Sequence, residues 1–371
     1  MKYYIIAGEA SGDLHGSNLM KALYERDANA DIRFWGGDAM MAVGGTMVKH
    51  IRDLSFMGFV EVFRHIGTVL GNIDMCKRDI ISYSPDAIIY IDFPGFNLRI
   101  AKFAHKHGFK NYYYISPQLW AWKKGRIRQM RRTIDRLFCI LPFEEEFYKK
   151  NSFPRATYVG HPLLDAIDGM CDSKKEDETE KPLIAVLPGS RRQELAHVFP
   201  TMLLLAERHP EFQFEVAGMS LIGDKVYSRY LSKVTNVTVS YDQTYRLLSK
   251  AYAAVVCSGT ATLETALFNV PQVVCYKANA LSIAIARCFV GNRVRFISLV
   301  NLIADREIVK ELLQQDYNIT KLESEFERIT KDESYRKNMC DGYAEVRRIL
   351  GDKGASKRVA EAVTESINSR S

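Results

Sequence analysis

Two stretches in the first half of this sequence carry carboxylates in settings suited to acid–base chemistry. The first reads GEASGD at residues 8–13, where small residues let a ligand approach the backbone and Glu9 and Asp13 add carboxylates. The spacing is not that of a dinucleotide-binding loop, and two acids would repel a pyrophosphate. Capping of the following helix by Ser11 and Asp13 is the structural alternative.

The second stretch reads IDFPGFN at residues 91–97 and follows an apolar run. Asp92 stands where that run stops, at the carboxyl end of an expected strand, which is where a general base would be placed. Capping of the next helix is the alternative for Asp92, but Asn97 suits that role better. The pattern therefore favours a chemical role for Asp92.

Two further stretches, in the second half, have the composition of phosphate-binding turns. Residues 187–192 read LPGSRR and present a Gly-Ser turn with guanidinium groups at the start of a helix. Residues 257–264 read CSGTATLE, where the free N–H groups of a helix start can receive a diphosphate and Glu264 can reach ribose hydroxyls. Together the four stretches predict a nucleotide diphosphate on the C-terminal side, facing an acid or base on the N-terminal side.

Short β-rich runs alternate with helical patterns along the chain, which is typical of parallel α/β sheets. Ligands in such sheets bind beyond the carboxyl ends of the strands, so these loops are the expected sites. The segment DSKKEDETEK at 172–181 has no apolar residue and is expected to be a solvated linker between two domains. The expected strands are 3–7, 32–35, 87–91, 112–115, 137–141 and 157–159, then 183–187, 212–217, 237–240, 254–257, 272–276 and 296–299.

Composition excludes several classes of protein. No uncharged stretch reaches the roughly 18 residues that span a bilayer, and the N-terminal residues read as a strand rather than a signal peptide. Seven scattered cysteines without a C-x-x-C pair favour reduced thiols and a cytoplasmic location. Neither a P-loop nor an H-E-x-x-H motif occurs, and no metal site is expected. The formal charge of +7 leaves phosphates, nucleic acid and an anionic membrane as possible partners.

At these loops the sequence resembles the lipid-A-disaccharide synthases, inverting glycosyltransferases of family 19 with the GT-B architecture. The resemblance is carried by GEASGD, MGFVEV, IDFPGFN, SPQLWAW, LPFE, GHPL, LPGSR, SGTATLE and NLIA, in order from residue 8 to residue 304. It implies an α/β fold of two Rossmann-like doubly wound domains facing across a cleft. The expected limits are 1–171 for the acceptor and membrane domain, 172–181 for the linker, 182–340 for the donor domain and 341–371 for a helical tail that could pack back on the first domain.

The resemblance implies condensation of UDP-2,3-diacylglucosamine with 2,3-diacylglucosamine 1-phosphate to lipid A disaccharide 1-phosphate and UDP, without a cofactor. Asp92 is the leading catalytic base, with Glu9 and Asp13 behind it. The resemblance implies a second Asp where this chain has Gly95, so a role assigned to that acid cannot be transferred. The positions expected to bind substrate are Ser11, Ser190, Arg191, Ser258, Gly259, Thr260, Glu264 and Asn301.

The substrates implied by the resemblance carry acyl chains, so the enzyme is expected to act at a membrane surface. An apolar helical stripe suits such contact, although a core-facing helix explains the same pattern. Basic residues between Lys123 and Arg136 suit anionic headgroups or the acceptor phosphate. We therefore expect peripheral association with the cytoplasmic side of the inner membrane and no nucleic-acid partner. The expected membrane-contact residues are Phe59, Val62, Phe63, Ile66, Val69 and Leu70.

Two other functions compete with this interpretation. One is a different UDP-sugar enzyme of the same architecture, either a 2-epimerase or the N-acetylglucosaminyltransferase of peptidoglycan synthesis. The latter usually carries a G-x-G-G-H turn after the first strand, where this chain has GEASGD. The other is a non-enzymatic basic surface binder, which the moderate charge and the absence of a nucleic-acid-binding motif disfavour.

Overall fold

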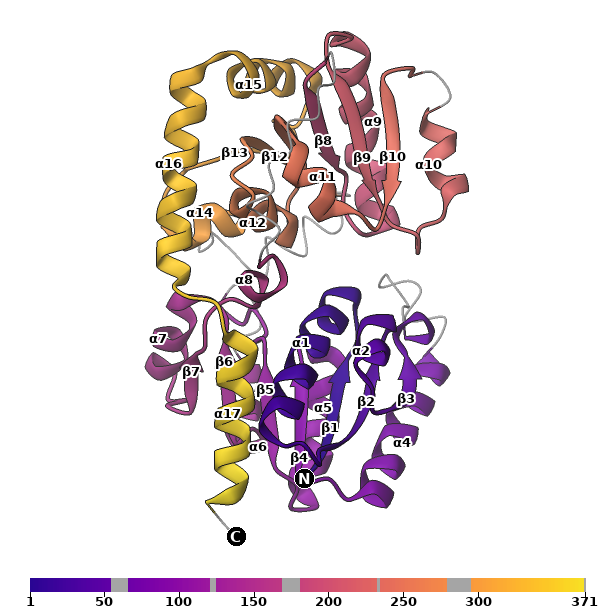
Figure 1. The fold of residues 1–371 in the computed structure, drawn as a ribbon, viewed down its shortest axis with the longest axis vertical. Coiled ribbons are helices and arrows are strands. Elements are labelled where there is room, and N and C mark those ends of the chain that lie inside the picture. The colour runs from indigo at the N-terminus through magenta and orange to yellow at the C-terminus, as the bar shows by residue number, and fades with distance from the viewer. Residues whose placement is uncertain (55–65, 121–124, 169–180, 232–233, 279–294, 370–371) are drawn as a thin grey trace. The chain divides into compact units, whose positions relative to one another are not determined.

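The chain folds into two compact units, each built on its own parallel sheet (Figure 1). The computed structural model describes residues 1–54, 66–120, 125–168, 181–231, 234–278 and 295–369. Unit 1 comprises Met1–Ala166 and Leu350–Ser371, and unit 2 comprises Ile167–Ile349. These divisions differ from the expected limits at 171 and 340, and most of the expected linker lies outside the described residues.

Unit 1 contains a seven-stranded sheet in the order β3-β2-β1-β4-β5-β6-β7. Its central strands are continuous apolar runs because both faces of a parallel sheet are covered by helices. In β1 and β4 every residue after Lys2 is buried. The strands are β1 (Lys2–Ala7), β2 (Asp31–Gly36), β3 (Thr46–His50), β4 (Ala87–Ile91), β5 (Asn111–Tyr114), β6 (Arg136–Cys139) and β7 (Ala156–Tyr158).

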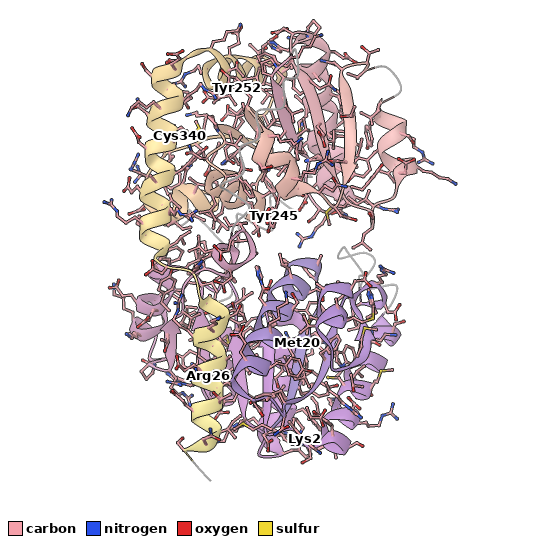
Figure 2. All side chains as sticks on the ribbon, viewed as in Figure 1. Lys2, Met20, Arg26, Tyr245, Tyr252 and Cys340 are labelled. Carbon is pink, nitrogen blue, oxygen red and sulfur yellow. The ribbon has the colours of Figure 1, made fainter. Side chains whose placement is uncertain are left out.

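Helices pack on both faces of this sheet. One face is covered by α4, α5, α6 and α7, whose inward residues include Ile73, Ile100 and Met130. On the other face, α1 packs beside the C-terminal helix α17, and Arg26 of α1 donates to Glu361 of α17 at 2.7 Å (Figure 2). The helices are α1 (Ala10–Arg26), α2 (Asp38–Val43), η1 (Ile51–Asp53), α4 (Ile66–Tyr83), α5 (Pro94–Lys106), α6 (Arg126–Thr133), α7 (Pro142–Lys150), α8 (Pro162–Ala166) and α17 (Ala355–Asn368).

The C-terminal helix α17 is therefore part of unit 1, although it follows unit 2 in the chain. Asp165 caps it by accepting hydrogen bonds from the N–H groups of Gly354 and Ser356. Tyr112 of β5 donates to Ser366 at 2.9 Å. The fold thus returns the chain end to the first domain.

Unit 2 contains a six-stranded sheet in the order β10-β9-β8-β11-β12-β13. Its strands are β8 (Leu183–Leu187), β9 (Gln213–Gly218), β10 (Val237–Tyr241), β11 (Ala253–Cys257), β12 (Gln272–Tyr276) and β13 (Lys310–Leu313). Its helices are α9 (Arg192–Arg208), α10 (Asp224–Leu231), α11 (Thr244–Lys250), α12 (Thr260–Leu267), α14 (Leu299–Ala304), α15 (Ile319–Lys331) and α16 (Glu333–Leu350). All pairings in both sheets are parallel, which confirms the expected α/β class of two doubly wound domains.

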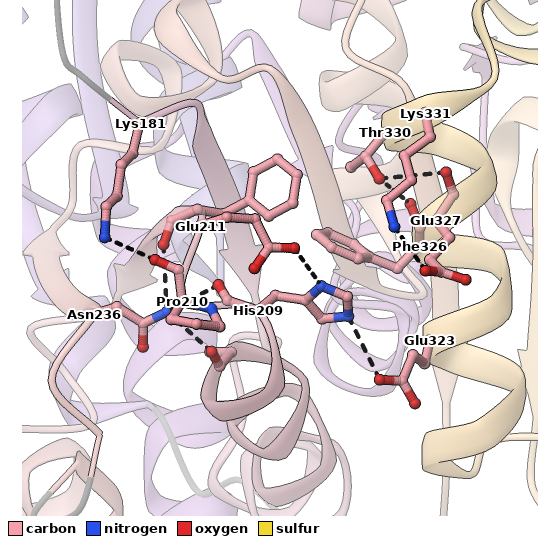
Figure 3. Close-up of polar contacts among 12 residues, drawn as sticks. Lys181, His209, Pro210, Glu211, Asn236, Glu323, Phe326, Glu327, Thr330 and Lys331 are labelled. Atoms are coloured by element: carbon pink, nitrogen blue, oxygen red, sulfur yellow. Dashed lines mark hydrogen bonds and ion pairs between the residues drawn. The ribbon is translucent and has the colours of Figure 1, made fainter.

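A buried histidine ties α9 to α15 just before β9 begins (Figure 3). Nδ1 of His209 lies 2.9 Å from Glu211 Oε1, and Nε2 lies 3.6 Å from Glu323 Oε1. The ring also packs against Phe326 at a centroid distance of 4.9 Å. This network lies at the amino ends of the strands, away from the edge where ligands of such sheets bind.

One expected strand is wrong and two strands were not anticipated. The run 296–299 is not a strand, because the Ser298 side chain caps α14 by accepting from the N–H of Asn301. The last strand of the sheet is instead β13, whose sequence KELL is short, polar and only partly buried. The edge strand β3 is likewise half-exposed. Edge strands carry a weak apolar signal because only part of their surface is covered.

Candidate functional site

The GEASGD loop and Asp92 leave the unit 1 sheet at the same edge. Ala7 pairs with Ile91, and Ile91 pairs with Tyr114, so the next residues in each strand, Gly8, Asp92 and Ile115, are neighbours. A Cβ on Gly8 would lie 2.3 Å from the Phe93 ring, so the two loops touch and this position needs glycine. Three strand ends thus bring together loops that are distant in the sequence, from Gly8 to Ile115.

The backbone at this edge is strained. Asp92, Phe93 and Ile115 have φ angles of 44°, 47° and 65°, in a region that non-glycine residues rarely adopt. The carbonyl oxygen of Asp92 accepts hydrogen bonds from Tyr113 Oη at 2.6 Å and Asn97 Nδ2 at 2.8 Å, which hold the turn. Such strain costs about 1–3 kcal/mol per residue and clusters at functional sites. The half-buried Asp92 is therefore held in a fixed position by main-chain contacts that do not use its carboxylate.

Asn97 does not cap α5, contrary to the expectation from sequence. Its fully buried side chain points back to the sheet, where Nδ2 also approaches the carbonyls of Ile6 at 3.4 Å and Ile91 at 3.3 Å. The N-cap of α5 is Phe93, which makes no side-chain capping bond. Asn97 thus joins the ends of β1 and β4 beneath Asp92.

The three polar residues of the GEASGD loop have different environments. Glu9 is the exposed N-cap of α1, and Ser11 is exposed in its first turn. Asp13 is buried, and its carboxylate accepts from the N–H groups of Gly37 at 2.7 Å, Ala39 at 3.0 Å and Met40 at 3.0 Å. Asp13 therefore caps the start of α2, a helix that sequence analysis did not connect with it, and this favours Asp92 and Glu9 over Asp13 as bases.

Gly95, where a second Asp was expected in relatives, leaves room for a side chain. It is exposed in the first turn of α5, and a Cβ there would meet no atom within 4 Å. An aspartate at this position would also interact favourably with the helix dipole. The missing acid therefore leaves an open position in the first turn of α5.

A buried carboxyl fixes the next loop along this edge. Glu144 at the start of α7 is 1% exposed and accepts from Ser116 Oγ at 2.6 Å and the N–H of Leu141 at 3.1 Å. Burial raises its pKa to about 7, and these hydrogen bonds offset only part of the desolvation. Both residues belong to motifs quoted for the resemblance, but nothing in the sequence indicated that they pair.

His15, one turn into α1, is buried and faces a second buried histidine, His161. Burial lowers the pKa of His15 to about 4 and that of His161 to about 3. Both are therefore neutral at physiological pH, and His15 belongs to the packing between α1 and α8.

In unit 2 the two phosphate-type turns also share a sheet edge. Leu187 pairs with Val256, and Cys257 pairs with Cys275, so the loops after β8 and β11 are adjacent. The positive charge of Arg191 reaches Cys257, where it opposes the burial that raises the thiol pKa to about 12. The expected juxtaposition of LPGSR and SGTATLE is thus present within this unit.

A carboxylate occupies the first of these turns. Glu194 Oε2 accepts from the N–H groups of Ser190 at 3.1 Å and Arg191 at 3.3 Å. Gly189, with φ of 103°, is required here because a Cβ would lie 2.5 Å from the same oxygen. The Arg191 guanidinium lies 3.5 Å from Glu194 Oε1, and its side chain is 53% exposed. The main-chain donors predicted to hold an oxyanion therefore already have an anionic partner, while the guanidinium still faces solvent.

Among the described residues, no side chain caps the second turn. Gly259 is the N-cap of α12 and makes no side-chain capping bond, and Thr260 starts the helix in an exposed position. Ser258 is turned the other way, with Oγ donating to the carbonyl of Ile297 at 3.2 Å. Glu264, one turn into α12, accepts a hydrogen bond from Tyr245 Oη at 3.1 Å (Figure 2). Burial raises the pKa of Glu264. Of the two turns, the start of α12 is the better placed to receive an anion.

Asn301 is buried in a network that holds the segment before β13. Its Oδ1 accepts from the N–H groups of Ile308 at 2.7 Å and Val309 at 3.0 Å, and its Nδ2 donates to Glu311 at 2.9 Å. Glu311 also accepts from the N–H groups of Ile297 and Ser298, at 2.9 and 3.0 Å. Asn301 is 0% exposed, and its amide oxygen and nitrogen are both engaged within this network. Its expected contact with the donor stays a prediction. Sequence analysis did not identify Glu311, because a single acidic residue in the segment KELL does not indicate any particular role.

The expected membrane-contact residues lie partly outside the described part of the chain. Phe59, Val62 and Phe63 lie outside the described residues, as does the side chain of Ile66. Val69 packs against the core of unit 1, whereas Leu70 is 52% exposed.

Within the described residues, no helix is both long and apolar enough to cross a bilayer. No group of three or more potential metal ligands gathers among them either.

Comparisons with solved structures show the fold alone. The S. aureus MnaA–UDP co-structure superposes with a TM-score of 0.71 at 13% identity, covering 99% of this chain and 97% of that one. The UDP-GlcNAc 2-epimerase of Methanocaldococcus jannaschii in complex with UDP-GlcNAc and UDP gives 0.68 at 12% identity, covering 98% and 100%. The 2-epimerase alternative gains no further support, because identities this low indicate shared architecture only.

Comparisons of sequence are more specific. A family model described as lipid-A-disaccharide synthetase matches residues 3–365. The lipid-A-disaccharide synthase of Geobacter metallireducens is 36% identical over 377 residues, covering 99% of this chain and 97% of that protein. The synthase of Anaeromyxobacter dehalogenans is 37% identical over 369 residues, covering 97% and 96%. The chain belongs to the lipid-A-disaccharide synthase family of glycosyltransferases.

Proposed function

We propose that this enzyme transfers 2,3-diacylglucosamine from its UDP derivative to 2,3-diacylglucosamine 1-phosphate, forming a β-1,6-linked disaccharide 1-phosphate and UDP. Membership of the synthase family supports the reaction class. The observation that carries the site assignment is the strained turn at Asp92, fixed by Tyr113 and Asn97 at the same sheet edge as Gly8. Unit 1 would take the acceptor and unit 2 the donor.

Asp92 is the proposed general base. Its carboxylate takes the proton of the acceptor 6-hydroxyl as that oxygen bonds to the anomeric carbon, while the bond from that carbon to the diphosphate breaks on the opposite face and UDP leaves. A positioned base contributes about 10²–10⁴ in rate. Glu9, exposed in the neighbouring loop, is the second candidate, and Ser11 beside it is a proposed acceptor contact. Asp13 ranks last because it caps α2.

The departing diphosphate is proposed to bind at the start of α12. The main-chain donors at Gly259 and Thr260 and the positive end of the helix dipole stabilise its charge, and Arg191 adds a guanidinium from the adjacent loop. Ser190 lies in that loop, and Glu264 is placed to accept from ribose hydroxyls. These groups neutralise the leaving charge without requiring a metal in the scheme. Removing one such donor typically costs about 10²–10³ in turnover.

The acyl chains of both substrates support peripheral association with the cytoplasmic face of the inner membrane. The exposed Leu70 and the apolar stripe before it are the proposed contact, with Val69 turned to the core. Replacing Phe63, Ile66 and Leu70 by Ser should reduce sedimentation with liposomes. Unchanged sedimentation would refute this contact.

Product analysis tests the whole proposal. The purified protein is incubated with UDP-2,3-diacylglucosamine and 2,3-diacylglucosamine 1-phosphate, and the products are identified by mass spectrometry. Disaccharide 1-phosphate and UDP in equal amounts are expected. Asp92→Asn should lower kcat at least about a hundredfold. The variant should still fold, because Tyr113 and Asn97 hold the turn through the carbonyl oxygen of Asp92. Near-normal turnover of this variant would refute the base assignment.

A further inference from the structure

Arg126 is a half-buried cation at the very start of α6. Within the described part of the chain, its guanidinium forms no hydrogen bond and no ion pair. A positive charge in the first turn opposes the helix dipole, and this turn contains no acidic residue that would offset it. The stability of α6 therefore does not explain an arginine at this position.

The start of α6 lies at the sheet edge that carries Asp92. At the other end of the helix, the carbonyl of Thr133 accepts from Asn111 Nδ2 at 3.0 Å, so α6 ends beside the first residue of β5. The helix rises about 10 Å from Thr133 back to Arg126, which is also about the length of β5. Arg126 therefore lies level with the end of β5, and Asp92 follows β4, the strand that pairs with β5.

Packing fixes the start of α6 beside the start of α5. Gln129 Nε2, one turn into α6, donates to the carbonyl of Leu98, one turn into α5, at 2.8 Å. Ile127 and Met130 are buried in the same core cluster as Tyr113. The first turn of α6 is therefore held in place next to the helix that Asp92 precedes.

The buried hydroxyl of Tyr113 links Arg126 with Asp92. Tyr113 Oη donates to the carbonyl oxygen of Asp92 at 2.6 Å. Burial raises the pKa of this hydroxyl well above its ordinary value, the negative charge of Asp92 raises it further, and the positive charge of Arg126 opposes both. The carboxylate and the guanidinium are therefore both close enough to act on one phenol.

Other cations at this edge have internal partners. Lys49 and Arg52, at the end of β3, pair with aspartates at 2.9 and 2.6 Å. Arg358, beside the end of β7, donates to the carbonyl of Val159 at 2.7 Å. Among these described cations, Arg126 is the one whose charge is available to an external anion.

We propose that Arg126 binds the 1-phosphate of the acceptor sugar while Asp92 faces the 6-hydroxyl of the same sugar. This assignment rests on the proposed function, whose acceptor carries that phosphate. In the sugar ring, C1 and C5 are both bonded to the ring oxygen, and C6 is attached to C5. The phosphate and the 6-hydroxyl therefore leave neighbouring corners of one ring, and the two groups that recognise them must lie within one sugar of each other.

A phosphate monoester suits this position for two physical reasons. A guanidinium can donate two parallel hydrogen bonds to two oxygens of one phosphate. A negative ligand at the start of α6 would also interact favourably with the helix dipole, and Gly125, the N-cap, makes no side-chain capping bond that would compete. Bound phosphate would thus remove the unfavourable interaction that Arg126 has with its own helix.

Two acceptors test the assignment, 2,3-diacylglucosamine 1-phosphate and 2,3-diacylglucosamine without the phosphate. Both are dispersed in a neutral detergent, so that no anionic bilayer is present, and are assayed with the UDP-linked donor. Arg126→Gln should lower kcat/KM for the phosphorylated acceptor at least about tenfold, as expected for loss of a charge-assisted hydrogen bond. For the acceptor without phosphate, kcat/KM should stay within about twofold of the wild type.

An equal loss with both acceptors would overturn the proposal, because it would assign Arg126 to Asp92 or to the fold. No loss with either acceptor would overturn it as well. Arg126→Lys keeps the charge but not the paired donors, so it should recover part of the activity with the phosphorylated acceptor. Lys106→Gln, in the last turn of α5, removes the same charge at the opposite end of that helix and should leave both values unaltered.

Two binding measurements complete the test without relying on turnover. In an Asp92→Asn background, calorimetry should show that Arg126→Gln raises the Kd for the phosphorylated acceptor at least about tenfold, and an unchanged Kd would overturn the proposal. The Kd for UDP should not change, since weaker UDP binding would assign Arg126 to the donor diphosphate instead. If the wild type forms no disaccharide at all, the proposed function fails, and the binding result still decides the phosphate site.

Discussion

The carboxylate of Glu194 lies between the main chain and the side chain of Arg191, with Oε2 3.3 Å from the Arg191 N–H and Oε1 3.5 Å from its guanidinium. The sequence LPGSRR suggested an oxyanion site at this turn, but an internal anion already takes its main-chain donors. A diphosphate drawn to Arg191 must therefore compete with Glu194 for this guanidinium.

Glu194→Gln should tighten the binding of UDP. The amide oxygen can still accept from the N–H groups of Ser190 and Arg191, but the competing charge is removed, so the UDP Kd should fall about two- to fivefold, as expected for a partly exposed ion pair. Isothermal titration calorimetry measures the Kd. Glu207→Gln, an exposed change at the other end of α9, is the control and should leave it unaltered. Unchanged or weaker UDP binding by Glu194→Gln would contradict the competition.

Gly95→Asp should be tolerated and should partly rescue an enzyme that lacks the Asp92 carboxylate. The position is open and lies in the first turn of α5, where a negative charge stabilises the helix by about 0.3–1 kcal/mol. The single variant should therefore have an unchanged or slightly raised Tm. In the Asp92→Asn background, the added acid should raise kcat at least about tenfold above that of Asp92→Asn alone.

Gly95→Asn is the matched control for this experiment, because it fills the same space without adding a base. If Gly95→Asn restores kcat in the Asp92→Asn background as well as Gly95→Asp does, the rescue is an effect of packing and does not come from an added base. No rescue by Asp would mean that an acid at this position cannot reach the acceptor hydroxyl in this chain.

Asn301→Ala should destabilise unit 2 without weakening the intrinsic affinity for UDP. The change leaves the buried N–H groups of Ile308 and Val309 without their acceptor, and each unsatisfied buried group costs about 1–3 kcal/mol. Glu311 also loses one of its donors but keeps those of Ser298. Urea unfolding should show the loss, and the UDP Kd measured well below the unfolding transition should stay within about twofold of the wild type. A normal unfolding midpoint with much weaker UDP binding would support direct contact with the donor instead.

The strands that could be predicted from the sequence are those that depend on the residues of the strand itself. Strands 87–91 and 183–187 are continuous apolar runs because helices cover both faces of the sheets, and the loops that follow them lie where parallel α/β topology requires. The run 296–299 has a similar composition, yet its N–H groups at Ile297 and Ser298 are taken by the distant Glu311, so it does not form a strand.

The side-chain partners could not be predicted because they depend on long-range contacts. Asp13 stands in a loop that looks like a ligand site, and only the fold brings the start of α2, 24 residues away, into its reach. The pairing of Ser116 with Glu144 spans 28 residues in the same way. The spacing of motifs predicts which residues lie at a sheet edge. Tertiary packing determines which of the acidic residues there already accept hydrogen bonds from the protein.

Glu144 should make the stability of the protein depend on pH between about 4.5 and 7. Its pKa is about 7 in the folded state, against an ordinary value of 4.5 when unfolded, so the folded state holds the proton more tightly. The corresponding stability is fully present below pH 4.5 and is lost as the pH rises to about 7. A shift of this size corresponds to about 3 kcal/mol. Glu144→Gln removes this dependence, so the wild type should lose about that much unfolding free energy relative to the variant over this range.

Urea unfolding of both proteins from pH 4 to pH 8 measures the difference, and other titrating groups cancel because they are common to both. Glu145→Gln is the matched control with the opposite sign. Hydrogen bonding to Lys149 lowers the pKa of Glu145, so its contribution is present above pH 4.5 and is lost as the pH falls. A wild-type advantage over Glu144→Gln that grows with pH would show that the hydrogen bonds from Ser116 and Leu141 outweigh burial, and that Glu144 is held ionised at neutral pH.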